Sequence, residues 1–163
     1  MDTKAAMDSG DGQTVKQEVS RGEGVVPEVE VSGEAKQILL AEDEREIRQV
    51  AEKILKRRGY EVIAVANGLE ALERYQEKPD EIDLIILDLN MPKMDGEQCL
   101  RELKKLGCRA PVIIATGAGL RPDCETDLLQ DAFGIVMKPF GIHSLIRAVS
   151  EALQEAPSAA SGP

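Results

Sequence analysis

One stretch decides the fold: LIILDLNMPKMDG, residues 84–96. Four apolar residues run directly into Asp88, and Pro92 and Gly96 follow within the next eight residues. A short apolar run that is bounded by turn residues is typical of a strand buried on both of its faces. The stretch therefore predicts a buried strand that ends in a carboxylate, and such an ending needs a physical reason.

The same kind of apolar run, rich in Val and Ile, occurs five times along the chain. The five predicted strands are 37–41, 61–65, 84–88, 111–115 and 134–137. Four of the segments that follow these strands carry apolar residues at helical spacing. These stripes are Ile47, Val50, Ala51, Ile54 and Leu55; Leu69, Leu72 and Tyr75; Leu100, Leu103 and Leu106; and Ile142, Leu145, Ile146, Val149 and Leu153.

The ends of these helices are also marked in the sequence. Gly59 is suited to a left-handed cap at the end of the first helix, and Asn67 with Glu70 resembles a capping box at the start of the second. The fourth connection, residues 118–131, holds a glycine, a proline and four acids among few apolar positions. We expect only a short or labile helix there.

Strands that alternate with helices indicate an α/β protein with a parallel sheet covered on both faces. Right-handed crossovers make such a sheet doubly wound. Ligands of doubly wound sheets bind beyond the carboxyl ends of the strands, where the strand order reverses. We therefore look for function at that edge.

Composition limits the domain organisation and the partners. Residues 1–36 hold eight acids against four bases with no sustained apolar period, which predicts a disordered acidic tail or linker before a folded domain at 37–155. Residues 156–163 read as a flexible C-terminal tail. The net charge of −10 argues against nucleic-acid binding. Three cysteines without a CxxC pair, and no apolar run of membrane-spanning length, predict a soluble protein of the reducing cytoplasm.

Polar side chains stand at the ends of four predicted strands. Glu42 and Asp43 follow the first, Asp88 ends the third, Thr116 ends the fourth, and Lys138 follows the fifth. Taken singly, each is explained as a helix cap, a turn residue or a solvated charge. Taken together, three carboxylates at one edge would repel each other unless a cation joined them. Oxygen ligands with room for water favour Mg²⁺.

The cation gives Asp88 a chemical task. A carboxylate can act as a nucleophile towards phosphorus and form an aspartyl phosphate. Phosphoryl transfer places charge on three equatorial oxygens, which need a metal ion, a cationic side chain and hydrogen-bond donors. Mg²⁺, Lys138 and the Thr116 hydroxyl would supply these groups.

At these residues the chain resembles the receiver domain of two-component response regulators. The resemblance rests on four motifs in order: ED at 42–43, LDLNMPKMDG at 87–96, ATG at 115–117 and KPF at 138–140. It covers residues 37–155. It implies that Asp88 is the phosphoacceptor.

The resemblance also implies the roles of the acidic residues. Asp43 and Asp88 would bind Mg²⁺ directly, together with the backbone carbonyl of Asn90. Glu42 would act mostly through water. Lys138 would pair with Asp88 or with the phosphoryl oxygens, and the hydroxyl of Thr116, at the end of the fourth strand, would move onto the phosphoryl group.

Further expectations concern the fold and the conformational switch. The resemblance implies strand order 2-1-3-4-5 and a cis peptide bond before Pro139. Ile135 stands where many receivers carry Tyr or Phe, so the usual aromatic part of the switch is absent. We therefore expect phosphorylation to change backbone order in residues 117–133 more than the packing around Ile135.

The expected partners follow from the same resemblance. A histidine kinase or a histidine phosphotransfer domain would donate the phosphoryl group, and the chain would act as a signalling domain rather than as an enzyme. No output domain follows residue 155, so we expect either a stand-alone receiver or one excised from a hybrid kinase. The downstream partner is not identified by the sequence.

Two other classes of protein compete with this interpretation. A haloacid dehalogenase-like aspartyl-phosphate phosphatase also places a nucleophilic Asp after a strand, but it needs a second Asp two residues later, where this chain has Asn90. A flavodoxin-like flavin-binding module needs a phosphate loop rich in Ser and Thr after the first strand. Here that loop opens with EDERE, which repels phosphate in the absence of a metal.

Overall fold

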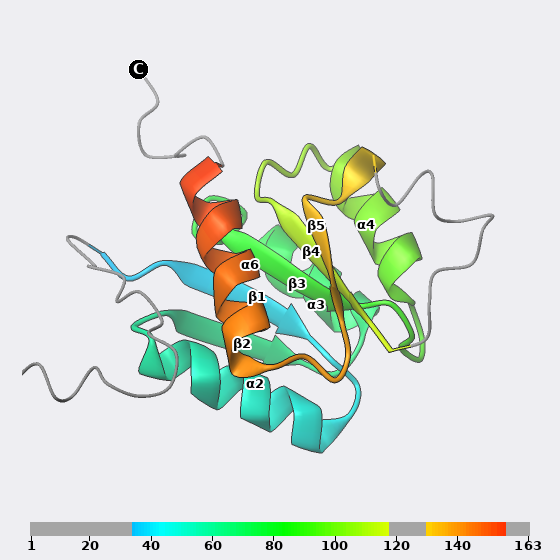
Figure 1. Ribbon diagram of the computed structural model, residues 1–163. Coiled ribbons are helices and arrows are strands. Elements are labelled where there is room, and N and C mark those ends of the chain that lie inside the picture. The colour runs from blue at the N-terminus through cyan, green and yellow to red at the C-terminus, as the bar shows by residue number, and fades with distance from the viewer. Residues whose placement is uncertain (1–33, 118–129, 156–163) are drawn as a thin grey trace, which may run out of the picture.

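The computed structural model describes residues 34–117 and 130–155 (Figure 1). Its elements are β1 (Gln37–Ala41), α2 (Arg45–Arg57), β2 (Glu61–Val65), α3 (Gly68–Glu77), β3 (Leu84–Asp88), α4 (Gly96–Lys105), β4 (Val112–Thr116), β5 (Gly134–Met137) and α6 (Ile142–Glu155). The predictions made for residues 1–33, 118–129 and 156–163 lie outside the described residues. Within the described ranges, no helix combines the length and the apolar character needed to cross a membrane.

The five strands form one parallel sheet in the order β2-β1-β3-β4-β5. This confirms the predicted fold class and strand order. The register pairs Ala41 with Leu87, Asp88 with Ala115, and Thr116 with Met137. Because all strands run the same way, the residues that follow them lie along one edge of the sheet, which we call the carboxyl edge. The opposite edge is the amino edge.

Four strands have the predicted bounds, but β4 begins one residue later than predicted, at Val112, and includes Thr116. Proline lacks a backbone N–H, so Pro111 contributes to the sheet's hydrogen bonds only through its carbonyl. That carbonyl accepts from the N–H of Ile85 at 3.0 Å. At the other end of β4, the carbonyl of Thr116 accepts from the N–H of Lys138 at 2.8 Å. The ladder therefore extends further towards the carboxyl edge than the apolar run alone indicated.

Two apolar cores lie on opposite faces of the sheet, and alternate residues of each central strand point into one or the other. The helices α2 and α6 cover one face, and α3 and α4 cover the other (Figure 1). The first core includes Ile38, Leu40, Leu55, Leu84, Ile86, Ile113 and Val149; the second includes Leu39, Ala71, Ile85, Leu87, Leu100, Leu103 and Ile114.

The predicted helix ends are present. The side chain of Asn67 accepts from the N–H of Glu70 at 2.9 Å, and the Glu70 carboxylate accepts from the N–H of Ala66 at 3.0 Å. This is the expected capping box, displaced so that the glutamate reaches the residue before the cap. Gly59 and Gly107 have φ of 91° and 79°, so both helices that precede them end in the left-handed conformation that glycine adopts most easily.

Each of the four predicted apolar stripes contains one exposed residue. Val50, Leu69, Leu106 and Ile142 are 56%, 41%, 47% and 51% exposed. The other residues of the stripes are buried or partly buried. Three of the exposed residues lie at helix ends, and Val50 lies on the flank of α2. Helical spacing predicts the direction of a side chain but not how far the opposing sheet extends.

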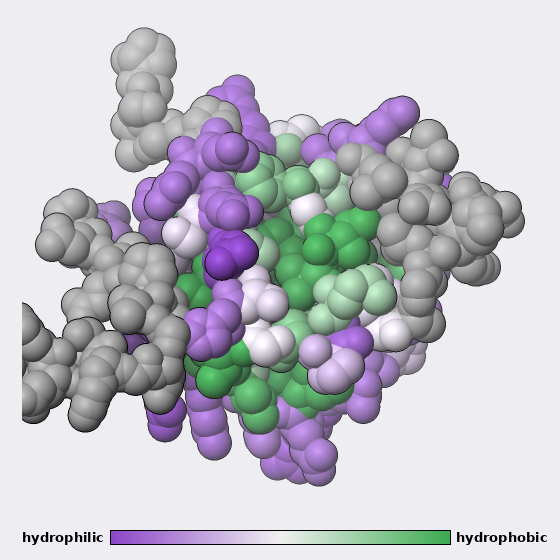
Figure 2. Space-filling view, viewed as in Figure 1, coloured by the Kyte–Doolittle hydropathy of each residue, from purple (hydrophilic) through white to green (hydrophobic). Residues whose placement is uncertain are grey.

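The sheet is buried most completely at its centre. All five residues of β3 are buried, whereas Phe133 and Met137, beside and within the edge strand β5, are 38% and 54% exposed. Figure 2 shows apolar side chains gathered on this side of the molecule, over β4 and β5 beside α6. The carboxylate of Asp88 thus ends a strand that is buried along its whole length.

Candidate functional site

Three carboxylates meet at the carboxyl edge. Glu42 and Asp43 follow β1, and Asp88 ends the neighbouring strand β3. One oxygen of each carboxylate lies within 4.8 Å of the others. Glu42 and Asp88 are buried, with 2% and 3% exposure, while Asp43 is exposed. The structure therefore brings together the three acids that the sequence placed at this edge, with Asp43 on the open side.

Lys138, which follows the edge strand β5, also reaches this acidic cluster. Its Nζ lies 2.8 Å from Oε2 of Glu42 and 3.3 Å from Oδ1 of Asp88. The contact with Asp88 agrees with the expectation from the resemblance. The shorter contact with Glu42 was not predicted, because no spacing in the sequence links two residues that lie 96 positions apart.

The turn between β1 and α2 is held by further hydrogen bonds. The N–H of Glu44 donates to Oε1 of Glu42 at 3.1 Å, and the guanidinium of Arg48 donates to the carbonyl of Glu42 at 2.7 Å. Arg48 also lies 3.4 Å from the carbonyl of Asp43. Arg48 was not predicted from the sequence, although a basic residue in the first turn of a helix that follows two acids is a signal that could have indicated it.

The loop after Asp88 is closed by backbone contacts. The N–H of Leu89 donates to the carbonyl of Ala115, and the N–H of Gly96 donates to the carbonyl of Leu89, both at 2.9 Å. A Cβ atom on Gly96 would lie 2.4 Å from the carbonyl oxygen of Asp88. Only glycine fits at this position without displacing the loop, so Gly96 fixes the path of the chain beside the carboxylate.

The remaining predicted residues also lie at the carboxyl edge. Thr116 ends β4 and is fully buried, and Asn90 is exposed with its N–H 3.4 Å from Oδ1 of Asp88. The peptide bond between Lys138 and Pro139 is cis, as the resemblance implied. Ile135 is partly buried and packs against the core under α3 and α4.

Burial and neighbouring charges shift the pKa values of Asp88 and Lys138. Burial raises the pKa of Asp88 to about 7, and the negative charge of Glu42 adds to this, while Lys138 opposes it. For Lys138, burial acts to lower the pKa, but the hydrogen bonds and charges of Glu42 and Asp88 together raise it. The lysine is therefore held charged, and Asp88 would be ionised more fully if a second cation were bound.

The donor set suits a hard divalent cation. Three carboxylates face one ammonium group, so the cluster keeps an excess of negative charge when all its groups are ionised. The ligand atoms are oxygens, and the exposed side of Asp43 leaves room for water, which is the environment that Mg²⁺ prefers. Among the residues that the structure describes, this is the one group of three or more side chains able to hold a metal ion.

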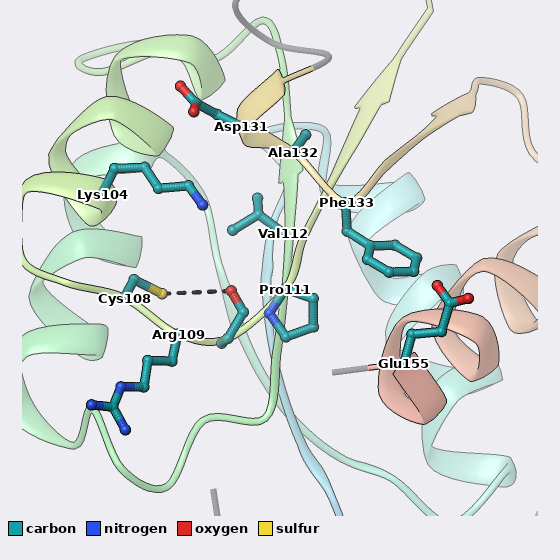
Figure 3. A pocket seen from close by; sticks show the side chains of 10 residues that line it. Lys104, Cys108, Arg109, Pro111, Val112, Asp131, Ala132, Phe133 and Glu155 are labelled. Atoms are coloured by element: carbon teal, nitrogen blue, oxygen red, sulfur yellow. Dashed lines mark hydrogen bonds between the residues drawn. The ribbon is translucent and has the colours of Figure 1, made fainter. Parts of the chain in front are cut away.

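A pocket lies at the amino edge. This pocket of about 240 Å³ lies between the ends of α4 and α6 (Figure 3). Its apolar wall includes Pro111, Val112 and Phe133, and its rim carries charges of both signs: Lys104, Arg109, Asp131 and Glu155. The four charged residues are exposed. The pocket has no group of converging carboxylates and no buried charge, in contrast to the carboxyl edge.

Comparison with known proteins agrees with this geometry. A family model described as the response regulator receiver domain matches residues 38–150. The chain is 32% identical over 120 residues to the chemotaxis protein CheY of Bacillus subtilis, an alignment that covers 73% of this chain and 98% of CheY. It is 38% identical over 127 residues to the sensor kinase CckA of Brucella abortus, covering 77% of this chain but only 13% of the kinase.

A solved structure shows the same fold. The complex of CheX with CheY, BeF3 and Mg²⁺ from Borrelia burgdorferi contains a chain that matches with a TM-score of 0.68 at 27% identity. The match covers 73% of the present chain and 90% of the Borrelia chain. The name of that complex includes both BeF3 and Mg²⁺.

Proposed function

The chain belongs to the response regulator receiver domain family, and on this premise we propose that it accepts a phosphoryl group on Asp88 in a Mg²⁺-dependent reaction and changes conformation in response. One observation carries the proposal. Asp88 ends a strand that is buried along its whole length, and two further carboxylates and the ammonium group of Lys138 lie around it. A buried cluster of this kind has a chemical purpose more often than a structural one.

The reaction is a direct transfer from a phosphohistidine. A carboxylate oxygen of Asp88 attacks phosphorus, a P–O bond forms as the P–N bond of the donor breaks, and the departing imidazole nitrogen takes up a proton. The raised pKa of Asp88 means that its proton must leave before the attack. The buried strand end and the closed loop at Gly96 hold the carboxylate in place for the donor.

Asp43 and Asp88, with the backbone carbonyl of Asn90, are the residues that would hold Mg²⁺, and Glu42 would contact it through water. When bound, the ion would neutralise charge on the transferring phosphoryl oxygens. The exposed position of Asp43 supports this assignment, because the ion and its water molecules need an open side.

Lys138 and Thr116 would stabilise the phosphoryl group from the other side. Lys138 already lies 3.3 Å from Asp88, and Thr116 ends the strand beside β3. An ammonium group and a hydroxyl are suited to the equatorial oxygens, on which charge accumulates. With Ile135 in the sheet, the response to phosphorylation would be carried by residues 117–133 rather than by a moving aromatic ring.

We assign the function to residues 37–155 and expect a histidine kinase or a histidine phosphotransfer domain as the phosphodonor. The chain aligns with nearly all of CheY and with 13% of the sensor kinase CckA, and these proteins represent two settings for such a domain. We place its action in the cytoplasm, and we expect its effect to be signalling rather than steady turnover of a substrate.

The proposal is tested by measuring intact mass after incubation with acetyl phosphate. We expect one phosphoryl adduct per chain with Mg²⁺ and none when the metal is removed by a chelator. An equal adduct without metal, or no adduct with metal, would contradict the proposal. Continuous release of phosphate from simple phosphate esters, far beyond one turnover per chain, would instead support the alternative of a haloacid dehalogenase-like phosphatase.

A further inference from the structure

The pocket at the amino edge takes no part in the proposed function, and a thiol lines it. Cys108 follows α4 and is partly buried, beside the apolar wall formed by Pro111 and Val112. Its S–H donates to the carbonyl oxygen of Ala110 at 3.7 Å (Figure 3). A small molecule that enters this cavity of about 240 Å³ therefore meets the sulfur atom.

The rim of the pocket carries charges of both signs that are not neutralised within the protein. Two bases and two acids line it: Lys104, Arg109, Asp131 and Glu155. Among the residues that the structure describes, none of these four forms an ion pair, and all four are exposed. A ligand that carries both a carboxylate and an ammonium group can therefore pair with charges of either sign around one apolar wall.

The two lysines at the end of α4 differ in their use. Lys105 pairs with Glu102 of the same helix at 2.9 Å. Lys104 has no such partner in the described part of the chain, and its side chain extends over the pocket on the same side as Cys108 (Figure 3). The guanidinium of Arg109 points away from the pocket in this view. Lys104 is therefore the base best placed to receive a carboxylate beside the thiol.

We propose that this pocket binds the disulfide of a small zwitterionic thiol, such as glutathione disulfide, and that Cys108 exchanges with it to form a mixed disulfide. The thiolate of Cys108 attacks one sulfur of the ligand, a new S–S bond forms as the old one breaks, and the departing thiolate takes up the proton that Cys108 lost. Cys108 is oxidised and the departing half is reduced, so no other oxidant is needed. This modification site does not depend on the proposed function.

The class of ligand follows from the charges on either side of the sulfur. Lys104 lies on the same side of the pocket as Cys108, whereas Glu155 lies on the opposite side, beside Phe133 (Figure 3). A zwitterion attached through sulfur can pair its carboxylate with Lys104 and turn its ammonium group towards Glu155. A disulfide with charges of one sign would be attracted by one side of the rim and repelled by the other.

The other cysteine in the described part of the chain serves as an internal control. Cys99 is fully buried in the core under α3 and α4, and its S–H donates to the carbonyl of Gly68 at 3.4 Å. Burial raises the pKa of its thiol to about 12, so little thiolate is present near neutral pH. Exchange is therefore expected at Cys108 and not at Cys99.

The first experiment locates the adduct. The full chain with Cys124→Ser, which removes the one cysteine outside the described residues, is incubated with glutathione disulfide at neutral pH. Peptide mass spectrometry without reductant then maps the mixed disulfide. We expect it at Cys108 alone, and we expect its complete loss when Cys108→Ser is added. No adduct at Cys108, or equal adducts at Cys108 and Cys99, would overturn the proposal.

The second experiment tests the pocket with two variants that remove the same charge from the same helix. Lys104→Gln should slow exchange with glutathione disulfide about fivefold at low salt, whereas Lys105→Gln should leave the rate nearly unchanged. Neither variant should alter the rate with the neutral reagent hydroxyethyl disulfide. Equal losses in both variants would show that overall charge attracts the ligand, and no loss in Lys104→Gln would remove the pocket from its role; either result would overturn the proposal.

The third experiment tests the class of ligand with disulfides of other charge. Glutathione disulfide is compared with the anionic dithiodiglycolate and the cationic cystamine. Each rate at Cys108 is divided by the rate of the same reagent with a free cysteine peptide, so that intrinsic reactivity cancels. We expect the largest ratio for glutathione disulfide. A ratio as large for either reagent of a single charge sign would overturn the assignment of a zwitterionic ligand.

Discussion

The two edges of one sheet differ in how they use their charges. At the carboxyl edge, Glu42, Asp88 and Lys138 are largely buried and in contact within 3.3 Å. At the amino edge, the charged residues around the pocket of Figure 3 lie on an exposed rim. Charges interact strongly where water is excluded and weakly where solvent screens them. Among the described residues, the comparison explains why the carboxyl edge, and not the amino edge, gathers side chains that could hold a metal ion.

The two edges also differ in how closely their backbone is packed. At the carboxyl edge, Gly96 is packed so closely that a Cβ atom would meet the carbonyl oxygen of Asp88. At the amino edge, Gly134 opens β5, and an added Cβ would have no atom within 4 Å. The carboxyl edge therefore has little freedom in both its charges and its chain path, and the following predictions test each part of this contrast.

The largest effect is expected for Asp88→Asn. The variant lacks the nucleophilic oxygen anion, so the phosphoryl adduct formed with acetyl phosphate and Mg²⁺ should be lost entirely. Asp131→Asn at the amino edge makes the same chemical change on the rim of the pocket and should leave the adduct at the wild-type level. Intact mass measures both. Equal labelling of the two variants would remove the distinction between the edges.

The next effect concerns Mg²⁺ affinity. Asp43→Asn should weaken Mg²⁺ binding by roughly 100-fold, because it removes the charged oxygen of a proposed direct ligand. Glu155→Gln at the amino edge removes the same charge and should change affinity by less than about twofold, since exposed charges far from the ion are screened. Titration calorimetry gives both constants. Similar losses in the two variants would show that overall charge, rather than the cluster, governs binding.

The third prediction addresses the chain path. Gly96→Ala should lower the free energy of unfolding by about 1–3 kcal/mol, because the new methyl group collides with the backbone at Asp88. Gly134→Ala should change it by less than about 0.5 kcal/mol. Urea denaturation of the metal-free proteins measures both values. A Gly96→Ala variant as stable as the wild type would show that the loop is less constrained than the contact distances indicate.

The smallest effect is that of pH. Because Asp88 has a pKa of about 7 and must lose its proton to bind a cation, Mg²⁺ affinity should fall as the pH decreases. The expected decrease is about tenfold between pH 8 and pH 6, with release of a proton on binding below pH 7. Calorimetry in buffers of different ionisation enthalpy measures this proton. A constant affinity across the range would contradict the raised pKa.

Much of the fold could be predicted from the sequence because its signals are local. The apolar runs at 84–88 and 134–137 and the cap formed by Asn67 and Glu70 depend on neighbouring residues, and the structure contains them as predicted. The start of β4 was misplaced because Pro111 belongs to the apolar run by composition but cannot donate to the ladder. The exposure of Val50 could not be predicted, because burial depends on the extent of the opposing surface and not on spacing alone.

The candidate site was predictable in its members but not in its contacts. Parallel strands bring their ends to one edge, so Glu42, Asp88 and Lys138 could be grouped without coordinates. Which carboxylate the lysine reaches depends on strand order and side-chain length together. The pairing with Glu42 across two intervening strands, and the support from Arg48, therefore emerged only from the three-dimensional arrangement.

The central claim is that the phosphoryl group is attached to Asp88, and the most direct test locates it in the wild-type chain. Borohydride reduction of the protein labelled by acetyl phosphate converts an aspartyl phosphate into homoserine, which tandem mass spectrometry of peptides can place. The account predicts homoserine at position 88 in the peptide that contains LIILDLNMPK. Homoserine at position 43, at another acid, or at no position of a protein that carries the adduct would contradict it.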